Sequence, residues 1–353
     1  MIGYGGIDEK INFGKHAKQS YIDLYNKFNF NLYINSYSKY ISTRDSLPHA
    51  LNFDLESIDY IDKKYFQNNL LDHTTKSTLK KNLFFERNNK ILTLKNRAIN
   101  YCNKKTTVCL RNNFISLDKN YFLKNFKYNE LEIFIKKTKS EGSILYQYLW
   151  RSLYELNFIH GYINLVFDKV QFENQLSNLP KIIKNSDHDL YFFHFLFPHR
   201  PFIFEIDNQK KCLFSKNKTQ DTYFTNRTEN VEQHYKEIIC TNYLVQNFLT
   251  NLSKDNFLEE INILITSDTG LKIRGNQKKQ QYYVDAHANL FAIKLKDEKF
   301  SKISEEVTSS QELFSRYFNS KHFDKNKKLE VIEKKYMNIY DPAVKSFINV
   351  NFK

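Results

Sequence analysis

Three polar residues follow three apolar runs that have the composition of buried β-strands. Thr43 comes after NLYINSY (31–37), His199 after YFFHFLFP (191–198), and Asp268 after INILIT (261–266). In an open α/β sheet, ligands bind just beyond the carboxyl ends of the strands. A hydroxyl, an imidazole and a carboxylate that meet there favour metal-assisted group transfer: the hydroxyl attacks, a cation neutralises the ester oxygens, and the histidine exchanges a proton with the leaving group.

Each of these residues also has a purely structural interpretation. Thr43 can be an ordinary loop threonine, His199 a loop histidine with satisfied hydrogen bonds, and Asp268 a turn-forming residue before Gly270. His194 alternates with two phenylalanines, which predicts that it packs within its strand.

A helix is predicted to begin directly after Thr43. Asp45 or Ser46 followed by Leu47 and Pro48 is typical of a helix start, because proline is tolerated in the first turn, where its missing N–H would have no partner. Thr43 would then lie just ahead of a helix N-terminus, where backbone amides and the helix dipole favour an anion.

Strands alternate with helices along the chain, and several strands are apolar on both faces. This pattern predicts an α/β fold: a three-layer sandwich with a mostly parallel central sheet and helices on both faces. Ser309 and Glu312 have the spacing of a helix capping box. The predicted helices are 20–30, one from 45 or 46, 144–158, 229–254 and one from 309, and the predicted strands are 31–37, 91–94, 189–198, 261–266 and 287–296.

The composition describes a globular protein with few flexible segments. Of 353 residues only 8 are Gly and 5 are Pro, while 41% are hydrophobic and 16% aromatic, which excludes Gly- or Pro-rich linkers and a disordered chain. No apolar run approaches the ~18 residues of a membrane span, and the opening MIGYGGIDEK lacks a secretory signal pattern. We expect the chain to begin in mid-fold, with a first strand and any membrane segment lying upstream.

The formal charge of +14 favours anionic partners such as phosphate or sulfate esters, acidic glycans, lipid head groups or nucleic acid. Lysines are spread over the whole length, however, so coding bias explains the charge better than a dedicated patch, and no nucleic-acid partner is expected. The sequence leaves the oligomeric state open.

Four cysteines, at positions 102, 109, 212 and 240, lack the CxxC pairs of a zinc site. Cys102 and Cys109 are close enough in sequence for a small looped disulfide in an oxidising compartment, and they fit buried thiols equally well.

Several segments, in order, carry a resemblance to a known family. SKYISTRDSLPHALNF, FFHFLFPHRPF, the helix HYKEIICTNYLVQNFL leading into INILITSDTG, and HANLFAI resemble the sulfatase-like branch of the alkaline phosphatase superfamily over about residues 20 to 320. This branch includes membrane-anchored enzymes that move phosphoglycerol or phosphoethanolamine onto surface polymers and lipids. The resemblance implies an alkaline phosphatase-like fold and an extracytoplasmic or periplasmic location.

Carried over residue by residue, the resemblance implies Thr43 as nucleophile and metal ligand, His199 as substrate-binding histidine and Asp268 as metal ligand. His287 matches a further active-site histidine, and Ser46 is placed to donate to the ester or to cap the helix. The implied cofactor is one divalent metal ion (Ca, Mn, Zn or Mg).

Two departures from the family pattern concern the metal. Thr269 occupies the position of a metal-binding histidine, and a hydroxyl is a weaker ligand than an imidazole. The strand that supplies an acidic ligand has no counterpart at the front of the chain, where Asp8 and Glu9 are expected to face solvent. We therefore expect a single metal site with reduced or lost affinity.

The sequence thus predicts a sulfatase-like catalytic domain over residues 1–325 and a C-terminal extension over 326–353. Its expected activity is hydrolysis or transfer of sulfate or phosphate esters of surface glycans or lipids, and because TRDSL is not the C/S-x-P-x-R signature of sulfatases, phospho-transfer or an atypical hydrolase is favoured. The alternative is a degenerate, inactive member that binds an anionic glycan or a partner.

Overall fold

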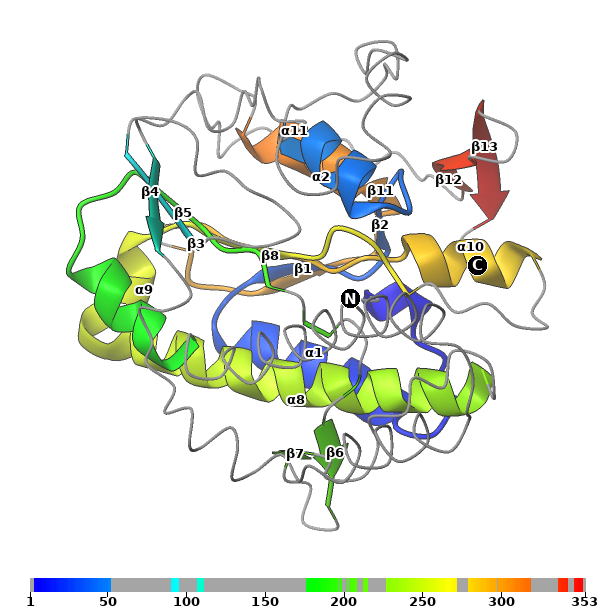
Figure 1. The fold of residues 1–353 in the computed structure, drawn as a ribbon, viewed down its shortest axis with the longest axis horizontal. Coiled ribbons are helices and arrows are strands. Elements are labelled where there is room, and N and C mark those ends of the chain that lie inside the picture. Colours follow the sequence, from blue (N-terminus) through cyan, green and yellow to red (C-terminus); the bar gives the residue numbers. More distant parts are fainter. Residues whose placement is uncertain are drawn as a thin grey trace, which may run out of the picture.

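The computed structural model describes residues 3–51, 90–94, 107–110, 176–195, 197–198, 202, 204–207, 212–214, 227–271, 279–296, 298–318, 336–341 and 346–351. These residues form a mixed α/β fold (Figure 1). The predicted helix 144–158 and Cys102 lie outside the described residues.

The site is built around a four-stranded sheet with the order β10-β1-β9-β8. Its strands are β1 (Asn31–Tyr33), β8 (Ile263–Thr266), β9 (Phe291–Lys294) and β10 (Lys302–Ser304). β1 runs parallel to β10, whereas β9 runs antiparallel to both β1 and β8. The expected mostly parallel central sheet is therefore not confirmed: this sheet is mixed.

The path between β8 and β9 explains the mixed sheet. When a connection crosses one face of a sheet, it returns the chain to the end at which the first strand began, and the next strand runs parallel to the first. Here the connecting helix α10 (Lys279–His287) lies at one end of the sheet (Figure 1). β9 therefore begins at the end where β8 stops and runs antiparallel to it.

Parallel pairing is found elsewhere in the described part of the chain. β3 (Ile91–Leu94) pairs in parallel with β4 (Thr107–Leu110) and with β5 (Leu190–Phe192). β2 (Ser36–Tyr37) pairs in parallel with β11 (Thr308–Ser309), so the predicted strand 31–37 is divided in two, because its halves pair with different partners.

Helices cover both faces of the four-stranded sheet (Figure 1). α1 (Gly14–Lys27) and α8 (Arg227–Ser253) lie on one face, and α2 (Thr43–Leu51) and α11 (Ser310–Phe318) lie on the other. Neighbouring strand residues point to opposite faces. Leu32 and Ala292 accordingly pack in the cluster that contains α1 and α8, while Tyr33, Phe291 and Ile293 pack in the cluster that contains α2 and α11.

Two hairpins complete the described strands. β6 (Phe204–Ile206) and β7 (Cys212–Phe214) form one, and β12 (Tyr336–Asp341) and β13 (Ser346–Asn351) form the other. The second hairpin lies in the predicted C-terminal extension, and its Met337, Ile339 and Val350 belong to the same core cluster as α1 and α8. The short helices are η1 (Tyr4–Gly6), η4 (Lys254–Asn256) and α9 (Phe257–Glu260).

α8 agrees closely with the predicted helix 229–254, but α1 begins and ends earlier than the predicted 20–30. At the start of α1 the preceding segment turns back close to the helix, since a Cβ on Gly14 would lie 2.2 Å from the backbone oxygen of Asp8. None of the described helices is long and apolar enough to cross a membrane.

A disulfide between Cys212 and Cys240 joins β7 to α8. The sequence did not indicate this pair, because the two cysteines are 28 residues apart and share no motif. The pairing of Cys109 with Cys102 stays a prediction, since Cys102 lies outside the described residues.

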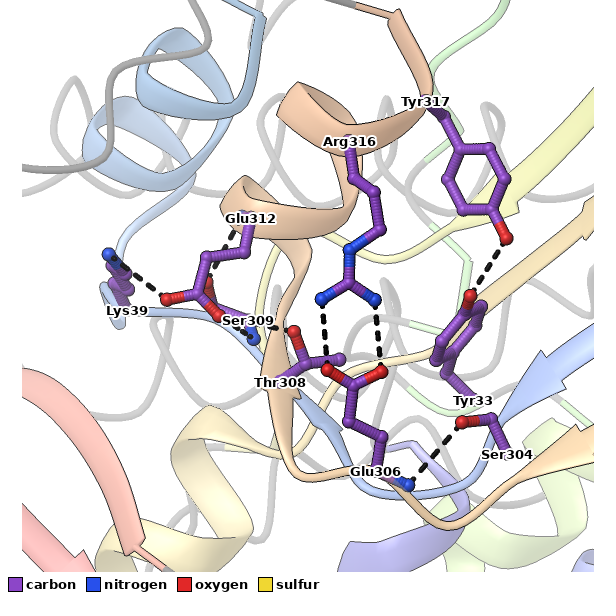
Figure 2. Close-up of polar contacts among 9 residues, drawn as sticks. All are labelled: Tyr33, Lys39, Ser304, Glu306, Thr308, Ser309, Glu312, Arg316 and Tyr317. Atoms are coloured by element: carbon purple, nitrogen blue, oxygen red, sulfur yellow. Dashed lines mark hydrogen bonds and ion pairs between the residues drawn. The ribbon is translucent and has the colours of Figure 1, made fainter. Parts of the chain in front are cut away.

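The predicted capping box at the start of α11 is confirmed. The Glu312 N–H donates to Ser309 Oγ at 3.1 Å, and the Ser309 N–H donates to the Glu312 carboxylate at 3.4 Å. Thr308 and Lys39 bind the same Glu312 carboxylate (Figure 2). The Thr308 hydroxyl donates to one carboxylate oxygen at 3.1 Å, and the Lys39 Nζ lies 3.8 Å from the other. The start of α11 is therefore attached to the segment that precedes α2.

Ser309→Ala should lower the free energy of unfolding by about 1 kcal/mol, because the amide of Glu312 loses its acceptor. Urea denaturation measures the effect. Ser253→Ala is the control, since Ser253 is exposed at the end of α8 and should change stability by less than about 0.5 kcal/mol. Equal losses in the two variants would contradict a capping role.

Candidate active site

The structure brings Thr43 and Asp268 together from distant parts of the chain. Thr43 is the first residue of α2, and Asp268 lies just beyond the end of β8. The Thr43 hydroxyl donates a hydrogen bond to the Asp268 carboxylate. Two of the three strand-end residues that the sequence singled out therefore lie in direct contact.

Ser46 fastens α2 to the same loop. Its hydroxyl donates to the backbone oxygen of Asp268, and its oxygen lies 2.7 Å from the hydroxyl oxygen of Ser38. Because Ser46 is 1% exposed, its contacts are made with protein atoms in the interior. The structure thus gives Ser46 a part in holding the Thr43–Asp268 pair.

The Asp268 carboxylate is electrostatically stabilised. Burial raises the pKa of this carboxyl, but favourable electrostatic interactions, including hydrogen bonds from the Thr43 hydroxyl and the Thr269 backbone, outweigh that effect. The resulting pKa of Asp268 lies below its usual value. The residue is therefore ionised at neutral pH, and its carboxylate accepts the hydrogen bond from the Thr43 hydroxyl.

His194 lies near this carboxylate, and the prediction that it packs within its strand is wrong. β5 ends at Phe192, so His194 lies beyond the carboxyl end of the strand. Burial lowers the pKa of His194, while the charge of Asp268 opposes the shift, so the two side chains are close enough to influence each other. A sequence signal for this position existed, because a polar residue just beyond an apolar strand was the pattern that singled out His199. The phenylalanines on both sides of His194 made the strand look longer than it is.

His287 is buried at the end of α10, where it holds the segment that leads to Thr43. Its Nδ1 lies 2.7 Å from the backbone oxygen of Ser38, and the Ser38 N–H donates to the backbone oxygen of His287 at 2.7 Å. A carbonyl oxygen can only accept, so Nδ1 carries the proton. Through these contacts His287 holds the backbone that precedes Thr43.

His199, the third strand-end residue, lies outside the described residues. Its substrate-binding role stays a prediction.

The described residues do not fit a zinc centre. Zinc in proteins is held by three or four Cys, His, Asp or Glu ligands, and the described part of the chain has no group of three such side chains. Thr269 is buried, and its hydroxyl makes a long 3.4 Å contact with the backbone oxygen of Gly270. Asp8 and Glu9 are both exposed, as expected, and Glu9 pairs with Lys18 at 2.9 Å.

Comparisons with known proteins support the fold. No family model matches this chain, and no curated protein matches it. Among solved structures, it is similar to the C-terminal periplasmic domain of EcEptC from Escherichia coli, crystallised in complex with Zn. The two share 11% sequence identity with a TM-score of 0.51, and the match covers 100% of this chain and 90% of that chain. A likeness at this identity shows a similar fold alone.

Thr269→His should increase zinc affinity by about tenfold or more, because it places an imidazole next to the Asp268 carboxylate. Competition with a chromophoric chelator measures the dissociation constant. Thr250→His, on an exposed position of α8, controls for zinc bound by any added surface histidine. Tight one-to-one zinc binding by the unaltered chain, with no gain in Thr269→His, would contradict this account of the ligand set.

Proposed function

We propose that this chain is a phosphotransferase-like domain that transfers or hydrolyses a phosphate ester, or the related sulfate ester, through Thr43. The observation that carries the proposal is the hydrogen bond from the Thr43 hydroxyl to the Asp268 carboxylate at the first turn of α2. The resemblance of the surrounding segments to enzymes that act on surface polymers and lipids supports an ester carried by a glycan or lipid.

The residues around Thr43 suit such a reaction. The N-terminus of α2 favours the negative charge of a phosphate or sulfate group. As the Thr43 oxygen forms its bond to phosphorus or sulfur, the bond to the leaving alcohol breaks, and the Asp268 carboxylate is positioned to accept the Thr43 proton. The departing alkoxide takes up a proton, and the neutral imidazole of His194, which interacts with Asp268, is suited to relay the proton that Asp268 took from Thr43, by accepting it on one nitrogen and releasing one from the other. No step is assigned to a metal ion.

An extracytoplasmic location belongs to the same proposal. Disulfides persist in oxidising compartments such as the periplasm and are rare in the cytosol. The Cys212–Cys240 disulfide and the likeness to a periplasmic domain both support this location.

A second candidate function is an inactive family member that binds an anionic glycan or a partner protein. The ligand set favours it, because Thr269 offers a hydroxyl where the family pattern has a metal-binding histidine, and because Asp8 and Glu9, near the position of the missing acidic ligand, are exposed.

Thr43→Ala should reduce turnover of bis(4-nitrophenyl) phosphate by about a thousandfold or more, because no oxygen remains to attack. Asp268→Asn should cause a comparable loss, and Thr43→Ser should retain part of the activity because it keeps the hydroxyl. Release of 4-nitrophenol measures turnover, with the aryl phosphate monoester and aryl sulfate tested in parallel. Thr250→Ala, on the exposed face of α8, is the matched control and should keep full activity.

The outcome separates the two candidate functions. Equal turnover by wild type and Thr43→Ala rules out Thr43 as nucleophile. Absence of turnover on all three esters by folded wild-type protein, tested with and without Mn²⁺, Ca²⁺ or Zn²⁺, favours the inactive binder.

Protein expressed in an oxidising compartment should carry the Cys212–Cys240 bond. Peptide mapping without reduction should find the two cysteines linked, and Cys240→Ala should lower the free energy of unfolding by about 3.6 kcal/mol, as the loop-closure relation gives for a separation of 28 residues. Full thiol labelling of both cysteines would contradict the proposed location.

A further inference from the structure

Gln311 is a buried glutamine on the first turn of α11 whose side chain faces the segment that carries Thr43. Gln311 is 0% exposed. It lies between Ser309 and Glu312, the two residues that make the capping hydrogen bonds, so capping does not explain why its polar side chain is buried. Its amide makes hydrogen bonds to residues on both sides of Thr43.

The amide oxygen of Gln311 contacts a residue that precedes Thr43 in the chain. Gln311 Oε1 accepts a hydrogen bond from the backbone N–H of Lys39 at 3.1 Å. The Lys39 side chain in turn lies 3.8 Å from the Glu312 carboxylate, as Figure 2 shows. Two consecutive residues of α11 therefore bind the same residue ahead of the nucleophile position.

The amide nitrogen of Gln311 contacts Ser46, which follows Thr43 in the chain, and Ser38, which precedes it. Gln311 Nε2 lies 3.2 Å from Ser46 Oγ, 3.3 Å from the backbone oxygen of Ser46 and 3.5 Å from Ser38 Oγ. The partners fix the orientation of the amide, because a backbone N–H requires the oxygen and a backbone carbonyl requires the nitrogen.

One side chain thus spans the segment 39–46. Ser46 continues the connection, since its hydroxyl donates to the backbone oxygen of Asp268. A continuous series of hydrogen bonds therefore runs from the amide nitrogen of Gln311 through Ser46 to Asp268. The amide oxygen of Gln311 binds the backbone N–H of Lys39. Both members of the Thr43–Asp268 pair are attached to Gln311.

We propose that Gln311 is a positioning residue: its amide fixes the segment 39–46 so that the Thr43 hydroxyl is held against Asp268. The kinetic part of this inference rests on the proposed function, in which Thr43 is the nucleophile. The structural part concerns only the order of the segment. Displacement of a reacting group by about 1 Å can cost about a hundredfold in rate.

The test uses Gln311→Met, which keeps a similar volume and removes both hydrogen-bonding groups. Gln311→Glu is the second variant, because it keeps the acceptor for the Lys39 N–H and places an oxygen opposite the carbonyl of Ser46. The matched control is Asn242→Leu. Asn242 is also a buried amide, 3% exposed, but it donates to Ser20 at 2.8 Å between α8 and α1, on the other face of the sheet (Figure 1).

Hydrogen exchange followed by mass spectrometry gives a readout that does not require activity. In Gln311→Met, amides of the segment 38–46 should exchange about tenfold faster, while peptides of α1 and α8 remain at the wild-type rate. Gln311→Glu should give a smaller increase in the same segment, and Asn242→Leu should affect α1 and α8 alone. Faster exchange throughout the chain, failure of both Gln311 variants to fold, or no change in 38–46 would overturn the proposal.

Steady-state kinetics on the aryl ester that wild type turns over provides the second readout. In Gln311→Met, kcat should fall about tenfold to a hundredfold with KM within about twofold of wild type, because substrate contacts remain and only the nucleophile is displaced. Asn242→Leu should retain both constants. A rise in KM at constant kcat would overturn the positioning role. If wild type shows no turnover, the proposed function fails while hydrogen exchange still decides whether Gln311 orders the segment.

Discussion

The hydrogen bond between the Thr43 hydroxyl and the Asp268 carboxylate is the contact on which the arrangement of the site depends. It joins the first turn of α2 to the loop that follows β8, and contacts from neighbouring described residues support both sides of it. Ser46 binds the backbone of Asp268, and His287 binds the backbone of Ser38 ahead of α2. A hydroxyl and a carboxylate that come from separate elements keep a fixed distance only if both elements are held in place.

The chemistry available at this contact is that of oxygen groups. An ionised carboxylate, an alcohol and a nearby neutral imidazole can move a proton and form an ester bond. The same groups make a poor zinc site, because zinc requires more nitrogen, sulfur or carboxylate ligands than the described residues bring together. The likeness to a domain crystallised with Zn is therefore a likeness of fold.

Local elements were predictable where one short-range signal dominated. The apolar period of α8, the short, mostly apolar segment of β3 and the paired Ser309 and Glu312 at the start of α11 each correspond to an element in the expected place. Predictions failed where partners decide the outcome. The strand 31–37 divides because β1 pairs with β10 and β2 with β11, and β9 runs antiparallel because α10 lies at the end of the sheet.

The sequence by itself determined the chemical groups: a threonine before a helix start, an aspartate after an apolar strand, and a threonine in place of a metal-binding histidine. Those are properties of residue type and local pattern. Only the tertiary structure decided which of them meet. Thr43 and Asp268 are 225 positions apart, and the contacts of Gln311 with Lys39 and Ser46 have no local signature. Side chains so distant along the chain are brought within hydrogen-bonding distance by sheet pairing and helix packing, which no short stretch of sequence encodes.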